Sequence, residues 1–592
     1  MNSFSKQVLA TCVGMFLFFI IVSILSVLSL VGMVASMQAT KRVKSNSVLV
    51  LNLSGGLTER SEGNVVSMLT GNGSESLGLD DVLTAIEKAT DNEKVKGIYM
   101  ECGMLDPDSY ASLAAIRNAL SAFQKQGKWI IAYGDMYTQS SYYLASVADK
   151  VYMNPQGEVD WHGLSAEPMY MKDMLEKFGI KMQVAKVGAY KSAVEPYTST
   201  SMSDANREQI GEYINGIWSE ITTSVSASRK IPVDSLNAFA DRLILFDAPE
   251  TFVKKHMIDS LVYTDGIKPI VCKRLGIEEE DDINLLSVED MCNTKGKKRR
   301  GETIAVYYAW GEVVDDESGS PLSKGVSIVN SFRVCRDLKR LAEDEDVKAV
   351  VLRVNSPGGS AYASEQIWHA VTQLKTKKPV VISMGGLAAS GGYYLSANAN
   401  WIVAEPLTLT GSIGIFGMFP DASNLLTEKL GLHFDAVKTN KHSDFGTPSR
   451  PFSAEEMSYL ESYINRGYSL FRKRVADGRK MSVEQVEKIA QGRVWLGKKA
   501  KEIGLVDELG GLEVAVKKAA QLAKLGDEYH TRSYPAKLSL WERLTEEDVM
   551  GSYINTRLSS ELGEYFQPFT LLKRFNTHSA VQAALPYIPN IK

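Results

Sequence analysis

Residues 93–101 read EKVKGIYME, and residues 345–353 read EDVKAVVLR. The correspondence continues farther along the chain, where residues 141–144 (SYYL) match residues 392–395 (GYYL). A nearly constant offset that is kept over so many residues indicates that one structural unit occurs twice. In a chain of 592 residues, this repeat predicts two large domains of the same fold.

Each copy alternates runs of strand-forming residues with helical stretches. In the second copy, residues 347–354 and 380–384 are rich in β-branched side chains. Between these runs, Ile367, Val371 and Leu374 recur at the spacing of one face of a helix. The alternation predicts stacked βαβ units with parallel strands, and therefore an α/β fold in both copies.

Two apolar runs, residues 47–53 and 303–308, are expected to be the first strands of the two copies. A polar stretch with clustered acids and bases separates the copies, and we expect it to be a solvated connector. The residues after 526 have no counterpart in the first copy. We therefore expect five regions: an N-terminal anchor with its flank (1–45), the first repeat (46–270), a charged connector (271–301), the second repeat (302–526) and a C-terminal tail without an assigned role (527–592).

The N-terminal region is apolar, with no charged residue between Lys6 and Lys41. Residues 8–34 are dominated by Val, Leu, Ile, Phe and Met, and a helix of that length crosses a hydrocarbon core of about 30 Å. A cleaved signal peptide has an apolar core of only about 7–15 residues, so we expect an uncleaved transmembrane helix. Because Lys41, Arg42 and Lys44 follow this segment, the positive-inside rule alone favours a cytoplasmic location for the rest of the chain.

Composition argues against several classes of partner. The net charge of −4 gives no electrostatic reason to expect a nucleic acid. None of the five cysteines forms a CxxC pair, and none of the seven histidines belongs to a recognisable metal motif. The glycine-rich segments match neither a P-loop nor a dinucleotide-binding pattern. We therefore expect neither a metal nor a cofactor.

Two glycine-rich segments follow successive strands of the second copy, residues 355–360 (NSPGGS) and 385–392 (GGLAASGG), and we expect both to be turns. Ser390 lies where the second turn passes into a helix. Such a position exposes a hydroxyl beside backbone N–H groups that can stabilise an oxyanion. The alternative is a small-residue turn that only packs a helix against a strand.

A serine nucleophile needs a base. No histidine belongs to a recognisable triad, and the nearest candidate, His442, lies in an ordinary polar stretch. A buried lysine can replace histidine when desolvation lowers its pKa. Lys191 has small and apolar neighbours in residues 187–196 (VGAYKSAVEP), although a lone lysine is most often a solvated surface residue.

Four segments carry a resemblance to a known family: 190–197 (YKSAVEPY), 356–359 (SPGG), 388–394 (AASGGYY) and 410–414 (TGSIG). With these motifs in this order, residues 1–525 resemble the signal peptide peptidase A (SppA) family in its long, tandem-repeat form. The resemblance implies two tandem ClpP/crotonase-like domains and a membrane-anchored Ser–Lys peptidase that degrades signal peptides left after preprotein cleavage. It also implies a homotetramer in the inner membrane, with its soluble domains on the periplasmic side, which we expect in spite of the charge bias.

The resemblance also assigns roles by position. Ser390 matches the nucleophile, Lys191 the general base, and Ser412 the serine that hydrogen-bonds the lysine. The backbone N–H groups of Gly359 and Gly391 match the oxyanion hole. Because the lysine must be neutral to accept the serine proton, the mechanism requires a pKa that burial has lowered.

The repeat divides these groups between the copies. In the opposite copy, the predicted nucleophile aligns with Gln139, its helper serine with Trp161, and the predicted base with Ser443. Residues 102–104 (CGM) stand in place of the first glycine turn. Each copy alone is therefore incomplete. We expect one active site where unlike copies meet, either within one chain or between neighbouring protomers.

Two other functions fit parts of the sequence. A crotonase-like acyl-CoA enzyme would use similar glycine-rich oxyanion turns. That chemistry usually needs acidic groups near the turn, and Glu365 is the only acid nearby. A non-catalytic membrane scaffold would use the glycine turns for packing alone.

Overall fold

The computed structural model describes residues 11, 13–22, 24–25, 42–61, 76–278, 280–295, 301–315, 327–537 and 581–584. Most of the predicted transmembrane segment, residues 8–34, lies outside these ranges. Its described part is helical, and the apolar side chains there are exposed. Within the described ranges, no helix combines the length and the apolarity that a membrane crossing needs.

The first copy contains a sheet of seven described strands, in the order β2-β1-β3-β4-β5-β7 with β8 beside β1. Neighbouring strands run parallel, as predicted. The strands are β1 (Ser47–Thr58), β2 (Leu77–Gly78), β3 (Val95–Pro107), β4 (Trp129–Tyr137), β5 (Lys150–Val159), β7 (Ser260–Leu261) and β8 (Asn284–Leu286). Strand β8 comes from the predicted connector, and Leu286 and Met291 of that segment are buried. Part of the connector therefore packs against the first copy instead of being solvated.

The second copy contains a sheet of eight described strands, in the order β18-β16-β14-β12-β9-β20, with β15 beside β14 and β19 beside β15. These strands are parallel except for β18, which is antiparallel to β16. They are β9 (Glu302–Trp310), β12 (Val347–Ser356), β14 (Val380–Ala389), β15 (Trp401–Ala404), β16 (Leu409–Gly411), β18 (Val494–Leu496), β19 (Glu508–Leu509) and β20 (Tyr529–Tyr534). Strand β20 adds a segment of the predicted tail to this sheet.

The second glycine-rich segment is not a turn over most of its length. Strand β14 continues through Ala389, because Leu387 and Ala388 pair with Leu409 and Thr410 of β16. Small residues let the neighbouring backbone approach closely here without ending the strand. The turn that the sequence suggested is confined to the junction at Ser390.

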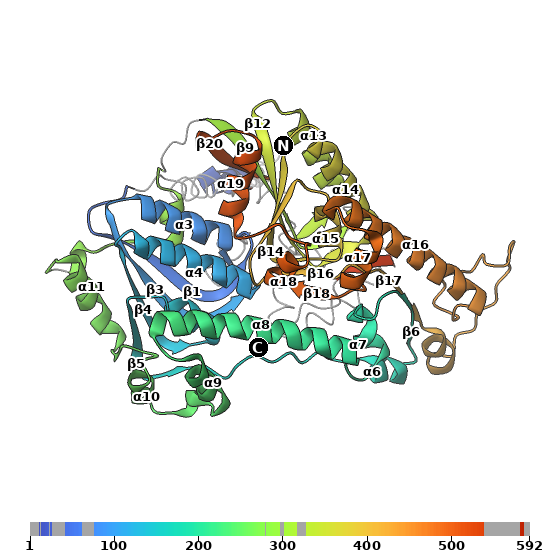
Figure 1. Ribbon diagram of the computed structural model, residues 1–592, viewed down its shortest axis with the longest axis horizontal. Helices are drawn as coiled ribbons and strands as arrows, with labels where there is room; N and C mark the ends of the chain where they lie inside the picture. Colours follow the sequence, from blue (N-terminus) through green and yellow to red (C-terminus); the bar gives the residue numbers. More distant parts are fainter. Residues whose placement is uncertain are drawn as a thin grey trace, which may run out of the picture.

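Helices cover the two large sheets (Figure 1). The first copy contributes α3 (Leu79–Asp91), α4 (Tyr110–Lys125), α5 (Gln139–Ala145), α6 (Lys172–Lys177), α7 (Glu195–Thr198), α8 (Asp204–Arg229), α9 (Val233–Asp241), α10 (Pro249–Lys254), α11 (Ile267–Leu275) and α12 (Val288–Cys292). The second contributes α13 (Ser331–Glu343), α14 (Ala361–Lys375), α15 (Gly391–Ser396), α16 (Ala454–Arg479), α17 (Val483–Ile489), α18 (Gly497–Glu502) and α19 (Leu512–Leu522). The predicted helical stripe Ile367, Val371 and Leu374 lies on α14 and is buried.

The longest helices in the described ranges show how closely the copies repeat. Helices α8 and α16 each have 26 residues. Each begins after a serine whose side chain accepts a hydrogen bond from the helix backbone, Ser203 or Ser453. Each ends at a lysine in the left-handed region, Lys230 or Lys480. The two helices therefore share their length, their N-terminal serine cap and their C-terminal lysine.

A third sheet joins the copies. Its described strands follow the order β11-β10-β13-β21-β17-β6. Strand β6 (Lys181–Lys186) belongs to the first copy and runs antiparallel to β17 of the second. The other members are β10 (Glu312–Val314), β11 (Ile328–Asn330), β13 (Gly358–Ser360), β17 (Phe416–Asp421) and β21 (Val581–Ala584). Because β6 precedes the loop of Lys191, this sheet brings that loop to the second copy.

A buried ion pair also links the copies. Glu59 of the first copy accepts hydrogen bonds from Arg353 of β12, at 2.6 and 3.2 Å, and both side chains are 4% exposed. Asn355, near the end of β12 and just before β13, donates to Glu59 at 3.0 Å and to Asp108 at 2.9 Å. Burial, and then the neighbouring Glu59 carboxylate, raises the pKa of Asp108 to about 6. First-copy carboxylates thus hold the end of β12, which leads into the glycines of β13.

Candidate active site

Lys191 and Ser390 of the same chain form a hydrogen bond. The Nζ atom of Lys191 lies 2.9 Å from the Oγ of Ser390. It also lies 3.1 Å from the Oγ of Ser412 and 3.3 Å from the carbonyl oxygen of that serine. The exposed fractions of Lys191, Ser390 and Ser412 are 1%, 0% and 1%. The structure therefore brings together one side chain of the first copy and two of the second.

Ser390 lies at the junction between β14 and α15, whose first residue is Gly391. Its φ is 55°, in the left-handed region that is costly for a residue with a side chain. Such strain is typical of a serine that a strand-to-helix turn presents for reaction. The N–H of Ser390 donates to the carbonyl of Gly411 at 2.8 Å, which ties the junction to β16. The predicted place of this serine, at the start of a helix, is confirmed.

The loop that carries Lys191 packs against a glycine of the second copy. Gly492 has a φ of 81°, and a Cβ atom added there would lie 2.6 Å from the backbone nitrogen of Lys191. Any side chain at this position would displace the backbone that carries the lysine, so glycine is required. The N–H of Tyr190 donates to the carbonyl of Gln491 at 3.0 Å, which fixes the loop beside that glycine.

Two polar side chains that no sequence motif indicated also hold this loop. Gln209 of α8 donates to the carbonyl of Tyr190 at 3.1 Å and accepts from the N–H of Val494 at 3.2 Å. Arg493 donates to the Tyr190 hydroxyl at 3.0 Å, and its guanidinium lies 4.6 Å from the centre of that ring. The same guanidinium pairs with Glu208 at 2.8 Å. Each of these two side chains bridges the copies, so the position of Lys191 depends on both copies.

The electrostatic state of Lys191 suits a base. Desolvation by burial lowers its pKa from 10.5 to about 7, so a large share of the amine is neutral near pH 7. Because the pKa in the folded state lies below the unfolded value, the buried amine destabilises the fold. The loss of folding stability is largest below pH 7, where the amine is protonated in both states. It disappears as the pH rises to 10.5, where the amine becomes neutral in the unfolded state as well.

Gly358 and Gly391 approach each other beside the junction. A Cβ atom on Gly358, whose φ is 93°, would lie 2.6 Å from the nitrogen of Gly391. Gly391 is the first residue of α15, where a backbone N–H has no acceptor within the helix. Gly359, the other predicted oxyanion donor, lies on β13 and pairs with Val313 of β10.

The counterpart positions do not form a second site of this kind. Gln139, the counterpart of the predicted nucleophile, donates to the carbonyl of Gly163 at 2.8 Å and accepts from the N–H of that residue at 2.8 Å. Trp161, the counterpart of the helper serine, is fully buried and donates to the carbonyl of Leu236 at 3.0 Å. Ser443, the counterpart of the base, is exposed on a loop.

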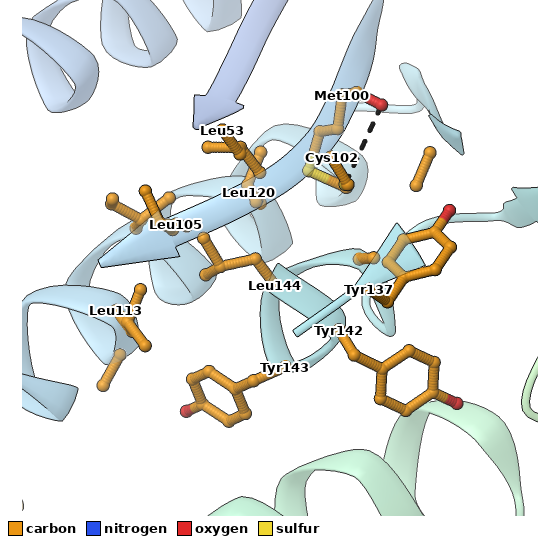
Figure 2. Close-up of a cluster of buried hydrophobic side chains, with 14 of the residues drawn as sticks. Leu53, Met100, Cys102, Leu105, Leu113, Leu120, Tyr137, Tyr142, Tyr143 and Leu144 are labelled. Atoms are coloured by element: carbon orange, nitrogen blue, oxygen red, sulfur yellow. Dashed lines mark hydrogen bonds between the residues drawn. The ribbon is translucent and has the colours of Figure 1, made fainter. Parts of the chain in front are cut away.

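Figure 2 shows what fills the corresponding part of the first copy. Cys102, which stands in place of the first glycine turn, lies in a buried cluster with Leu144, Tyr137 and Tyr142. Burial raises the pKa of the Cys102 thiol well above its ordinary value, so this thiol stays protonated at neutral pH. The cluster therefore has a packing role.

The other titratable residues considered from the sequence have different partners. His442 contacts Glu456 at 3.1 Å. Glu365 accepts a hydrogen bond from the Tyr394 hydroxyl at 2.6 Å and forms an ion pair with Arg474. Among the residues that the structure describes, no group of three or more His, Cys, Asp or Glu side chains could hold a metal ion.

Sequence comparison matches both copies to one family. The sequence model of Peptidase family S49 matches residues 122–269 and 372–526. The model of Clp protease matches residues 316–402, in agreement with the ClpP-like α/β fold expected from the sequence.

Three curated relatives align over most of the chain. It is 38% identical to "Protease 4" of Salmonella typhi, over 81% of this chain and 79% of that protein. It is 35% identical to "Protease 4" of Haemophilus influenzae, over 87% and 84% of the two chains. It is 30% identical to "Serine protease SPPA, chloroplastic" of Arabidopsis thaliana, over 82% and 70%. The chain therefore belongs to Peptidase family S49 and is a serine peptidase.

Proposed function

We propose that Ser390 is the nucleophile of this peptidase, that Lys191 is its general base, and that Ser412 orients the amine. The hydrogen bond of 2.9 Å between a buried lysine and a serine at a strained junction is the main support. The neutral amine takes the serine proton as Oγ attacks the substrate carbonyl. It then gives the proton to the leaving amine, and a water molecule activated by the same lysine hydrolyses the acyl-enzyme.

The oxyanion hole is proposed to consist of the N–H groups of Gly359 and Gly391. The close approach of Gly358, the neighbour of Gly359, to the nitrogen of Gly391 supports this assignment, because it brings β13 to the start of α15, directly after Ser390. Fixed donors stabilise the charge that develops on the carbonyl oxygen without reorganising during the reaction.

A fluorophosphonate probe is expected to label Ser390 at a rate that rises with pH through about 7 and then levels off. Below the lowered pKa of Lys191, protonation removes the base, so the rate falls about tenfold for each pH unit. The measurement is the labelling rate from pH 5 to 9, with the labelled peptide located by mass spectrometry. Lys191→Met should label slowly at every pH. A rate that is constant from pH 6 to 9 would contradict the assignment of the base.

The acyl-CoA alternative depended on an acid near the first glycine turn. Glu365 is bound to Arg474 and Tyr394 instead, which leaves that alternative without its acid. Labelling of Ser390 would also exclude a scaffold in which the turns only pack.

The substrates are proposed to be cleaved signal peptides and other short, apolar, unfolded peptides, and the enzyme is proposed to be anchored in the inner membrane with its soluble part in the periplasm. The apolar residues 8–34 and the relative named SPPA support this proposal. Protease added to spheroplasts should digest the soluble part while the inner membrane is still intact. Protection until lysis would place it in the cytoplasm.

A homotetramer is the proposed assembly. Exposed apolar side chains gather on the loop after β17, and such patches mark association surfaces. They are Leu430, Leu432, Phe434, Val437 and Phe445. Light scattering of the detergent-extracted protein should give four times the chain mass of 65.2 kDa.

A further inference from the structure

The strand that leads to Ser390 contains a bulge. In the pairing of β12 with β14, Val354 lies opposite Met384. The next pair is Ser356 with Ala388, so β14 advances by four residues while β12 advances by two. Extra residues in one strand bend it and redirect the side chains that follow. This bulge therefore sets the direction in which β14 reaches Ser390.

The side chain of Asn355 closes the bulge. The backbone N–H of Leu387 donates to the side-chain carbonyl of Asn355 at 3.0 Å. From β16 and the loop before it, the hydroxyl of Thr408 donates to the carbonyl of Gly385 at 2.7 Å. Both backbone groups lie where the regular pairing of β12 with β14 is interrupted. A buried backbone N–H needs an acceptor, and at this interruption Asn355 supplies one.

The same carboxamide ties the bulge to the first copy. Its two N–H groups donate to Glu59 at 3.0 Å and to Asp108 at 2.9 Å. The first copy also packs directly on the bulge, because a Cβ atom added at Gly386 would lie 2.3 Å from the Oγ of Ser109. The register of β14 is thus coupled to the position of the copy that carries Lys191.

A carboxamide is suited to this position by its chemistry. Among short side chains, asparagine alone combines two N–H donors with a carbonyl acceptor, and Asn355 uses both donors and the acceptor. A carboxylate would offer no donor to Glu59 and Asp108. An apolar side chain of the same shape would leave the N–H of Leu387 without this acceptor.

The first copy lacks this arrangement. When residues 93–101 are matched to residues 345–353, Gly103 is the counterpart of Asn355. The described pairs of β3 with β4 run from Gly97 opposite Trp129 to Cys102 opposite Gly134 without a shift in register. The copy that lacks the proposed nucleophile therefore has neither the carboxamide nor a bulge within these pairs.

We propose that Asn355 is a positioning residue for the peptidase reaction, a proposal that rests on the proposed function of Ser390 and Lys191. The carboxamide holds the bulge of β14 in register and fixes that register relative to the first copy. It also holds the end of β12, which leads into the glycines of β13. One side chain thus aligns the nucleophile, the copy that carries the base and the proposed oxyanion donors.

The test is the kinetics of fluorophosphonate labelling of the full-length protein in detergent. The pH is 8, above the pKa of about 7 of Lys191. Intact mass gives the rate constant and the final labelled fraction. Asn355→Leu should lower the rate constant about 100-fold, the loss expected when reacting groups are misplaced by about 1 Å. The final labelled fraction should stay at that of the wild type, whereas a purely structural loss would lower the fraction and leave the rate constant unchanged.

Asn398 provides the matched control. It is also a half-buried asparagine of the second copy, and its side chain bonds to Thr372 at 2.9 Å and to Lys375 at 3.3 Å. These partners lie on α14, and its loss should not alter the register of β14. Asn398→Leu is therefore expected to change the rate constant by less than about threefold.

A second pair of variants tests the carboxamide itself. Asn355→Asp places a carboxylate against Glu59 and Asp108 and should label slowly. Adding Asp108→Asn restores an N–H donor that faces the new carboxylate. The double variant should therefore label about tenfold faster than Asn355→Asp, although it carries one more substitution. In peptide hydrolysis the losses should appear in kcat, with KM nearly unchanged, because the alignment acts in the transition state.

The outcomes separate the two levels of the proposal. A wild-type chain that is not labelled at Ser390 overturns the proposed function itself. With a labelled wild type, the role of Asn355 is overturned if Asn355→Leu keeps the wild-type rate constant, at full or reduced final fraction, or if Asn398→Leu is slowed equally. Should Asn355→Leu fail to fold, the comparison of Asn355→Asp with its double variant decides, and equal rate constants overturn the proposal.

Discussion

Ser390→Ala is expected to lower kcat/KM for peptide hydrolysis by a factor of about 10⁴ or more, because no other group takes the place of a removed nucleophile. The fold should be unaffected. The Ser390 side chain contributes one hydroxyl, which accepts a hydrogen bond from Lys191, and the amine keeps the hydroxyl and the carbonyl of Ser412 as partners. The measurement is initial-rate kinetics on an alanine-containing apolar peptide, together with the melting temperature of the variant.

A buried serine at the other end of α15 provides the matched control. Ser396 of α15 is fully buried, and its hydroxyl donates to the carbonyl of Gly392 at 2.7 Å. Ser396→Ala should change kcat/KM by less than about tenfold, since it removes one neutral hydrogen bond far from any role in proton transfer. The loss of kcat/KM in Ser412→Ala should lie between those of Ser396→Ala and Ser390→Ala, because the Lys191 amine loses one of its two serine hydroxyl partners. If Ser390→Ala keeps a tenth of the wild-type rate, the assignment of the nucleophile fails.

Glu59→Ala is expected to destabilise the protein by about 3–5 kcal/mol, because it removes the ion-pair partner of Arg353, whose charge stays buried between the copies. The two side chains are 4% exposed and are joined by hydrogen bonds of 2.6 and 3.2 Å. Activity should fall as well, since Glu59 also accepts from Asn355 near the end of β12, just before the glycines of β13. Denaturant unfolding at pH 7 measures the free energy, and peptide hydrolysis measures the effect on the site.

An exposed ion pair on the same sheet is the control for this variant. Glu302 and Lys348 lie 3.7 Å apart with exposed fractions of 51% and 41%, and pairs of this kind contribute about 0–1 kcal/mol. Glu302→Ala should therefore be close to neutral. The double variant Glu59→Met/Arg353→Met should recover much of the lost stability, because it removes both buried charges. Equal losses for Glu59→Ala and Glu302→Ala would show that the buried pair does not hold the copies together.

The sequence predicts much of this molecule because several of its determinants are local. The strands show as β-branched runs, the α14 stripe as a helical period, and Ser390 as the small-residue junction between strand and helix. The division of groups between the copies follows from alignment of the repeat. The neighbours of Lys191 and the family resemblance indicate the base, and the structure places Lys191 2.9 Å from Ser390 within one chain.

Other features depend on residues that are distant in the sequence. Gln209, Gly492 and Arg493 support the lysine loop only because the copies meet there, and no local pattern distinguishes them from ordinary polar or turn residues. Glu59 and Arg353 are separated by 294 positions. The glycines of β14 resemble a turn in sequence, and only their pairing with β16 makes them part of a strand. Strand β21 is likewise defined by its partners, not by its four residues.

The hydrogen bond between Lys191 and Ser390 spans 199 positions of the chain. Ribosomes add about 5–20 residues per second, so the lysine emerges on the order of 10–40 s before its serine. During that interval a nascent chain lacks the proposed nucleophile, whatever its first half has already folded into. Hydrolytic activity is therefore expected to appear late in biosynthesis. Until Ser390 has been added, an incomplete chain should not cleave the ribosome or other proteins around it.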